Sequence, residues 1–259
     1  MRIRALAGLV GWVGGFLAAG SLEAAPLEGF TRVAESEHFV HFARGAAKTN
    51  VKSREAHLTR LEAQLSVQLE GQVEYYAHER PEDVQAVTGR YAAGYFFPSL
   101  GQVHATPDAE AHEIVHLVSH ELGDPGSFFN EGLAVALGNG DKFGGWPVDR
   151  VARNVLKRVS PEYLESQFAS LQTSWEAVAA AGSFVKWLDK RHGLPKVAEF
   201  FRASGRTGRP VGFESIFGQS LETELRAWAR SVGAEPLPVE PAVKLARIDA
   251  TPALAQPAR

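Results

Sequence analysis

The sequence contains no cysteine among its 259 residues. This absence excludes disulfide bonds, cysteine-type zinc sites, thiol nucleophiles and lipid modification of an N-terminal cysteine, so any metal must be bound by His, Asp or Glu. There is also no large excess of charge of one sign. The formal net charge at pH 7 is −3, which gives no electrostatic reason to expect nucleic acid as a partner. The composition, 45% hydrophobic and 22% charged, is typical of a globular protein with one sizeable core.

A long hydrophobic run is also missing, since no apolar stretch reaches the ~20 residues that a membrane-spanning helix needs. The uncharged run over residues 5–20 follows two arginines and precedes several small residues. A basic start, an apolar middle and a small-residue end are the three parts of a secretory signal peptide. We therefore predict a signal peptide at 1–24 and an exported protein, periplasmic or secreted, without stable membrane insertion after cleavage. Cleavage after Gly20 and cleavage after Ala24 both fit this pattern.

The rest of the chain changes its hydrophobic pattern near residue 106. Before that point the pattern predicts short strands and one long helix that begins at Val51; after it the pattern is predominantly helical. We predict an α+β fold, with a small mixed β-sheet and helices followed by a mostly helical C-terminal lobe. The predicted boundaries are a domain over 30–232, made of an α/β lobe over 30–140 and a helical lobe over 141–232, and a flexible Pro/Ala-rich tail over 233–259. The predicted strands span residues 38–42, 72–77, 91–97 and 102–105.

Residues 112–116 read HEIVH, an HExxH pattern. On a helix, two histidines four residues apart project from one face, so both imidazoles can reach one metal ion. Glu113 then lies beside the open position of the metal, where it can take a proton from water. The pattern predicts a Zn²⁺ site with His112 and His116 as ligands and Glu113 as the catalytic base. The competing interpretation is a pair of surface histidines on an amphipathic helix.

The sequence before this pattern predicts the start of its helix. Thr106 can act as the N-cap, and Pro107 suits the first helical position because proline has no backbone N–H to satisfy. We therefore predict a helix from Pro107 to about Leu122.

A catalytic zinc site needs a third protein ligand, and the best candidate is Glu131 in the segment FFNEGLA. This residue is predicted near the start of a second helix that packs against the first. Gly132 and Ala134 are small enough to let the two helices approach each other closely.

Three other residues near the pattern are candidate ligands. His120 extends the series of histidines, but eight residues of α-helix rotate by about 80° and rise by about 12 Å, which takes it out of reach of the same metal. Glu121 and Asp124 are more typical of helix-end and loop charges.

The segment AHEIVH followed by FFNEGLAVAL resembles the gluzincin metallopeptidases, in particular the bacterial peptidase-MA-like domains, where HExxH is followed by a W/F-x-EGxA helix. Weaker similarities in SEHFVHF, AGSFVKWLDKRHGLPKV and FESIFGQSLETELRAW extend the resemblance over most of the chain after the leader. The resemblance implies a thermolysin-like zincin architecture. It also implies that His112, His116 and Glu131 are zinc ligands and that Glu113 is the general base.

In gluzincins an edge strand next to the active helix pairs with extended substrate. The resemblance therefore makes Gly94, Tyr95 and Phe96 candidates for substrate binding. The chain departs from the family in two places: only fourteen residues separate His116 from Glu131, and the tyrosine that relatives often carry before the GSF stretch is missing from residues 176–180. Tyr163 and Tyr95 are the candidates to replace it as a support for the oxyanion.

The predicted function is an exported zinc metallopeptidase that acts on peptide or protein substrates. One alternative is a non-catalytic zinc-binding envelope domain that binds a partner, and another is a cell-wall peptide amidase. A basic run near the C-terminal end is expected to be a solvated helix face, with contact to a polyanion or a membrane as the alternative. Its members are Lys186, Lys190, Arg191, Lys196, Arg202, Arg206 and Arg209.

Overall fold

The computed structural model describes residues 27–47 and 50–235. The predicted signal peptide and nearly all of the predicted tail lie outside this part of the chain. Within the described ranges, no helix is both long enough and apolar enough to cross a membrane.

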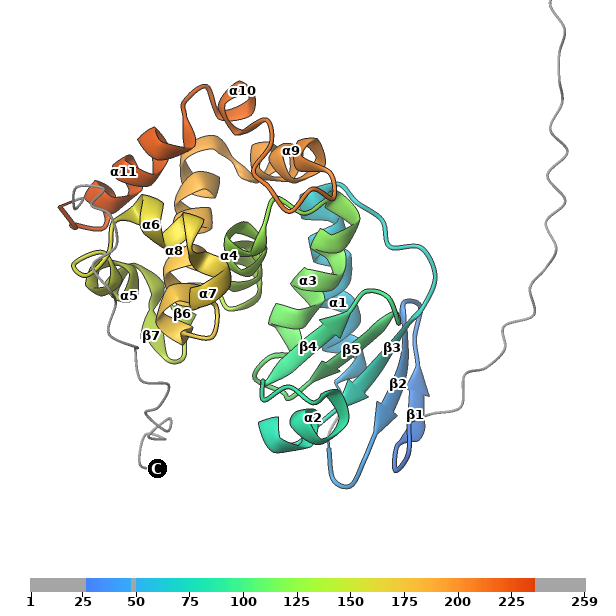
Figure 1. The fold of residues 1–259 in the computed structure, drawn as a ribbon. Coiled ribbons are helices and arrows are strands. Elements are labelled where there is room, and N and C mark those ends of the chain that lie inside the picture. The colour runs from blue at the N-terminus through green and yellow to red at the C-terminus, as the bar shows by residue number, and fades with distance from the viewer. Residues whose placement is uncertain (1–26, 48–49, 236–259) are drawn as a thin grey trace, which may run out of the picture.

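Five strands form one mixed sheet in the order β1-β2-β3-β5-β4 (Figure 1). β3 pairs in parallel with both β2 and β5, whereas β1 and β4 pair antiparallel with β2 and β5. β4 is therefore an edge strand. The five strands are β1 (Thr31–Glu35), β2 (Phe39–Ala43), β3 (Val73–Ala77), β4 (Gly94–Phe97) and β5 (Gln102–Ala105).

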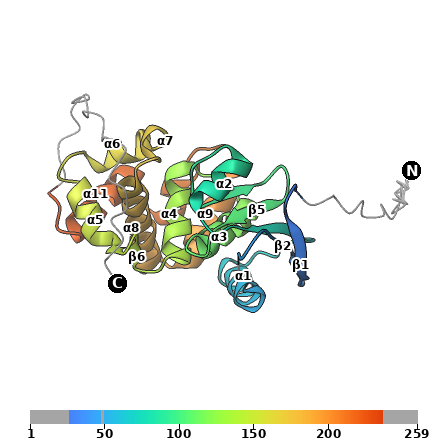
Figure 2. The same cartoon turned by 90° about the horizontal axis from the view of Figure 1, so that it is seen from below.

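Helices cover both faces of this sheet (Figures 1 and 2). α1 (Val51–Leu65) and α3 (Glu110–Leu122) pack on one face, and α2 (Pro81–Thr88) lies against the other. The leucines that recur at helical spacing in α1 are buried completely, as the amphipathic pattern predicts. They join β-strand residues and the apolar side of α3 in the main hydrophobic core.

The second half of the described chain is helical apart from one small hairpin. α8 (Trp175–His192) lies at its centre and packs against both α4 and α5 (Figure 1). The elements in chain order are α4 (Ser127–Gly138), β6 (Lys142–Phe143), β7 (Trp146–Pro147), α5 (Val148–Val155), α6 (Pro161–Ser166), α7 (Phe168–Leu171), α8, α9 (Leu194–Ser204), α10 (Phe213–Phe217) and α11 (Leu221–Ser231). A small mixed sheet with helices, followed by a mostly helical part, confirms the α+β class expected from the sequence.

Gly132 and Gly182 allow the close approach of α4 and α8. A Cβ added to Gly132 would lie 2.5 Å from Cγ2 of Val185, and one added to Gly182 would lie 2.2 Å from Cγ1 of Val135. The expectation that Gly132 brings α4 close to the HExxH helix is wrong, because Gly132 faces α8. The glycine that faces α3 is Gly138, at the other end of α4.

The predicted start of the HExxH helix is also wrong. α3 begins at Glu110 rather than at Pro107, and its N-cap Ala109 makes no side-chain capping bond. The backbone carbonyl of Thr106, not its hydroxyl, accepts the N–H groups of Ala109 and Glu110. Residues 107–109 therefore form a turn that precedes the helix, and Thr106 lies at the start of this turn rather than at the N-cap of α3.

Candidate metal centre

α3 is fixed to the sheet half of the molecule by contacts from α1 that reach its first turn. Nη2 of Arg54 lies 2.6 Å from a carboxylate oxygen of Glu110, and Nε2 of His57 lies 3.1 Å from the carbonyl oxygen of Ala111. Arg54 is fully buried and its guanidinium stacks 3.4 Å from the ring centre of Tyr75. These contacts hold the part of the helix from which His112 projects.

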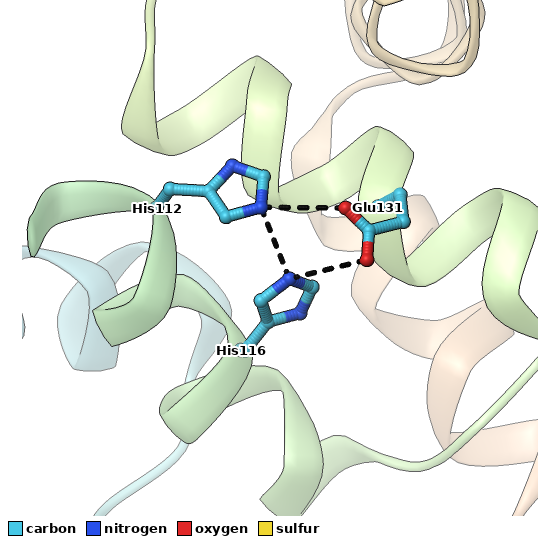
Figure 3. A group of neighbouring side chains, drawn as sticks. All are labelled: His112, His116 and Glu131. Carbon is cyan, nitrogen blue, oxygen red and sulfur yellow. Dashed lines mark hydrogen bonds and ion pairs between the residues drawn. The ribbon is translucent and has the colours of Figure 1, made fainter. Parts of the chain in front are cut away.

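The structure brings His112, His116 and Glu131 together between α3 and α4 (Figure 3). The Nε2 atoms of the two histidines are 3.1 Å apart. The Glu131 carboxylate oxygens lie 3.3 Å from Nε2 of His112 and 3.6 Å from Nε2 of His116. Among the described residues, this is the one group of three or more metal-ligating side chains that converges on a common point.

The separations of the three donors fit zinc. Ligands at the usual ~2.0–2.1 Å from a tetrahedral Zn²⁺ are separated from one another by about 3.3–3.4 Å, and the three observed separations lie between 3.1 and 3.6 Å. Two imidazoles and one carboxylate are also a ligand set that catalytic zinc uses. Each of the three side chains retains some solvent exposure.

Asn139 orients the first histidine. Its Oδ1 lies 3.0 Å from Nδ1 of His112, so that nitrogen donates and leaves Nε2 free for a metal. Asn139 can reach the ring because α4 ends close to α3. A Cβ added to Gly138 would lie 2.8 Å from Cα of His112.

In the absence of a metal, His112 and Glu131 form an ion pair. Burial opposes protonation of His112, but the hydrogen bond to Glu131 and the negative charges of Glu113 and Glu131 outweigh it and raise its pKa to about 9. Burial also opposes ionisation of Glu131, but its hydrogen bonds to both imidazoles hold the pKa of the carboxyl far below its usual value. Binding of a metal therefore has to displace the proton shared by this pair.

Glu113 is buried against the edge strand β4. Burial raises the pKa of this carboxyl, while the charges of His116 and His112 act in the opposite direction. The carboxylate accepts a hydrogen bond from the backbone N–H of Phe96. A Cβ added to Gly94 would lie 2.5 Å from Cγ of Glu113, so only glycine lets the strand pass this close.

The three residues predicted to bind substrate have different surroundings. Gly94 and the backbone of Phe96 contact Glu113, which makes them supports of the carboxylate. Tyr95 pairs with His104 across the sheet and lies beneath the guanidinium of Arg90, on the face away from α3. The edge position of β4 leaves backbone groups of Gly94 and Phe96 on its unpaired side.

The other candidate ligands near the HExxH pattern lie outside the triad. His120 contacts the ring of Phe96, at 5.7 Å between centroids, and the guanidinium of Arg206. Asp124 fixes the turn before α4, accepting hydrogen bonds from the N–H of Gly126 and the side chain of Asn130. The prediction that Asp124 is a loop charge is thus confirmed.

No tyrosine forms a hydrogen bond with the triad or with Glu113 in the part of the chain that the structure describes. Tyr163 belongs to α6, which packs against α11, and Tyr95 faces away from α3. The ring of Phe143 in β6 lies near His112, with 6.1 Å between the two ring centroids.

Sequence reasoning missed Asn139, Gly138 and the pair formed by Arg54 and Glu110. Asn139 lies at the end of the helix that carries the EGLA segment, eight residues after Glu131, so its helical position was the one available signal. Nothing in the sequence indicated the contact of Arg54 with α3. A scan of the chain against protein-family models finds no matching family, and a search of curated proteins finds no significant match.

Proposed function

We propose that the protein is an exported zinc-dependent metallopeptidase with a thermolysin-like zincin architecture. His112, His116 and Glu131 hold the metal in this proposal, and Glu113 is the general base. The observation that carries it is the convergence of three donor atoms at zinc-like separations from two helices, next to a buried carboxylate on the same helix turn. The segment over 1–24 supports export, because it has the three parts of a signal peptide.

Zinc bound by this triad would activate water and polarise a carbonyl group. Glu113 accepts the proton of the attacking water on its carboxylate and delivers it to the departing amine. Its raised pKa suits this role, because a general base works best when its pKa is close to the working pH. The N–H of Phe96 holds the carboxylate in place, and the side chain of Asn139 keeps His112 in the tautomer that binds a metal.

A non-catalytic zinc-binding domain is the second candidate. It is favoured by one observation: no described tyrosine contacts the triad, so this chain lacks the phenol that could support an oxyanion in relatives. The buried Glu113 argues against it, since a structural zinc site has no use for an unliganded carboxylate beside the metal.

The decisive experiment combines metal analysis with peptide digestion for the wild type and Glu113→Gln. We expect one zinc per chain in both proteins and loss of hydrolysis in the variant by a factor of ~10²–10⁴, the usual contribution of general base catalysis. Glu131→Ala should lose zinc under a chelator series that Asp124→Ala withstands. Zinc in a folded wild type that cleaves no peptide would favour the non-catalytic domain, and a wild type that binds no zinc would refute both candidates.

A further inference from the structure

Arg206 lies next to the metal-binding face of α3. Its guanidinium contacts the ring of His120, with 2.6 Å between Nη1 and Nε2. His120 follows His116 by four residues, so it projects from nearly the same side of the helix, about 6 Å further along the axis. The ring of Phe96 packs edge-on against His120, and the backbone of the same phenylalanine holds Glu113. The guanidinium is thereby linked through His120 to Phe96, the residue whose backbone contacts Glu113.

The loop that carries Arg206 is fixed to the end of α3. The carbonyl of Gly205 accepts a hydrogen bond from the N–H of Asp124, and the N–H of Gly208 donates to the carbonyl of Asp124 over 3.0 Å. Within the loop, the hydroxyl of Thr207 donates to the carbonyl of Ser204 over 2.9 Å. In Figure 1 the loop after α9 passes over the C-terminal end of α3. The backbone on either side of Arg206 is therefore fixed by hydrogen bonds to Asp124.

Two members of the basic run have carboxylate partners, which Arg206 lacks in the described part of the chain. Lys186 and Arg191 form ion pairs with Asp141 and Glu224, whereas Arg206 has no carboxylate within ion-pair distance among the described residues. Its partner His120 is kept neutral, because burial and the charge of Arg206 lower the pKa of the ring. The exposed guanidinium thus keeps its charge available one helical turn beyond His116.

Two carboxylates lie in the same region, and neither forms an ion pair with Arg206. Asp124 is engaged by the N–H of Gly126 and the side chain of Asn130. Glu121 is exposed and makes no ion pair with Arg206.

We propose that Arg206, held by His120 and Phe96, is a specificity subsite that receives a carboxylate of the substrate close to the cleaved bond. The inference rests on the proposed peptidase function and narrows its substrates to acidic peptides. The carboxylate can come from an Asp or Glu side chain or from the C-terminus of the peptide, since a guanidinium binds both in the same way.

The test uses matched peptides that carry Glu or Gln at one position near the cleaved bond, each with a free or an amidated C-terminus. At low salt, the wild type should cleave the peptide whose Glu faces Arg206 with a kcat/KM about fivefold higher than that of the matched Gln peptide. This is the effect of an exposed charge pair at the upper end of its usual range. The ratio should fall to about one in Arg206→Gln and in high salt. Arg209→Gln, in the same loop, is the matched control and should keep the wild-type ratio. A preference for the free C-terminus over the amide would identify the terminal carboxylate as the ligand.

The outcomes separate this inference from the proposed function. A wild type that cleaves peptides with no preference for a carboxylate at any position overturns the subsite and leaves the peptidase intact. Should no peptide be cleaved, the same peptides are titrated against the zinc form of Glu113→Gln by fluorescence anisotropy. The subsite is supported if the carboxylate peptide binds more tightly than its matched control and this difference is lost in the double variant Glu113→Gln/Arg206→Gln. Equal binding of all peptides overturns it.

Discussion

Gly94 sets the distance between the edge strand and the proposed base. Because a Cβ at this position would lie 2.5 Å from Cγ and 2.8 Å from Oε1 of Glu113, we expect Gly94→Ala to destabilise the protein by roughly 1–3 kcal/mol, the usual cost of overpacking a core. Urea unfolding of the metal-free protein measures this cost without any assay of activity.

The partner in this contact can be tested in the same way. Glu113→Ala removes Cγ, Cδ and Oε1, the three atoms that the new Cβ would meet. Gly94→Ala should therefore cost less in the Glu113→Ala background than in the wild type, and the difference is the coupling energy of the pair. Equal costs in both backgrounds would mean that the two residues do not constrain each other.

Asn139 is the residue that we expect to tune metal affinity without touching the metal. Asn139→Leu keeps the size of the side chain but leaves Nδ1 of His112 without its acceptor. Zinc affinity should fall by ~10–100-fold, as for other partners of metal-binding histidines. Competition with a fluorescent chelator measures it. Asn139→Asp retains an acceptor and is the control; wild-type affinity in Asn139→Leu would show that the contact does not orient the ring.

The sequence predicted the triad but not the residues that support it. His112 and His116 could be recognised as ligands because they lie four residues apart on a single helix, where spacing alone places both side chains on one face. Glu131 was visible through its resemblance to a known helix pattern. Gly94 and Asn139 act through the approach of β4 and of the end of α4 to α3. That approach is a property of tertiary packing, which spacing along the chain does not encode.

At the scale of elements, the position of α3 depends on a buried ion pair with α1. Arg54 has no exposed side-chain surface and donates to Glu110 two residues before His112. Removing one member leaves the other without its counter-charge, so we expect Arg54→Met and Glu110→Gln each to cost roughly 3–5 kcal/mol. The double variant should cost less than the sum. Urea unfolding measures all three.

A matched control is available in the helical part. Arg226 bonds Glu162 over 2.7 Å, but its side chain is 40% exposed, so Arg226→Gln should cost at most about 1 kcal/mol. An equally small cost for Arg54→Met would contradict the view that the buried pair fixes α3.

The boundaries of helices and strands depend on tertiary packing as well as on local sequence patterns. α8 begins at Trp175, because four alanines over 177–181 have high helix propensity. Gly182 follows them because a Cβ at this position would clash with Val135. The hairpin β6–β7 and the short helices α6, α7 and α10 were missed, since elements of a few residues carry too little periodicity to be recognised.

At the scale of the whole molecule, several histidines are buried as neutral parts of the sheet half. His78 and His104 bond each other over 3.0 Å, and the ring of His104 stacks on Tyr76. His41 lies against the guanidinium of Arg54. All three rings are buried. Together they link the stability of the fold to pH.

Burial lowers the pKa of all three to about 4, helped by the charge of Arg54 at His41, of Arg44 at His78 and by His78 at His104. An unfolded chain binds protons on these rings from a pKa of about 6.5. Between pH 6.5 and pH 4 the unfolded state therefore binds more protons than the folded state, and stability falls as the pH falls.

We expect the urea midpoint of the metal-free protein to be highest at or above pH 6.5 with respect to these groups and to decrease steadily down to pH 4.5. His112 has the opposite sign, because its raised pKa of about 9 adds stability that is lost only as the pH rises toward 9; below pH 6.5 its contribution is constant. The raised pKa of Glu113 also acts against the decrease, but as one group against three. His104→Gln removes one of the three groups and should make the decrease shallower. A midpoint that stays constant from pH 6.5 to 4.5, or one that falls as steeply in His104→Gln as in the wild type, would contradict the assignment.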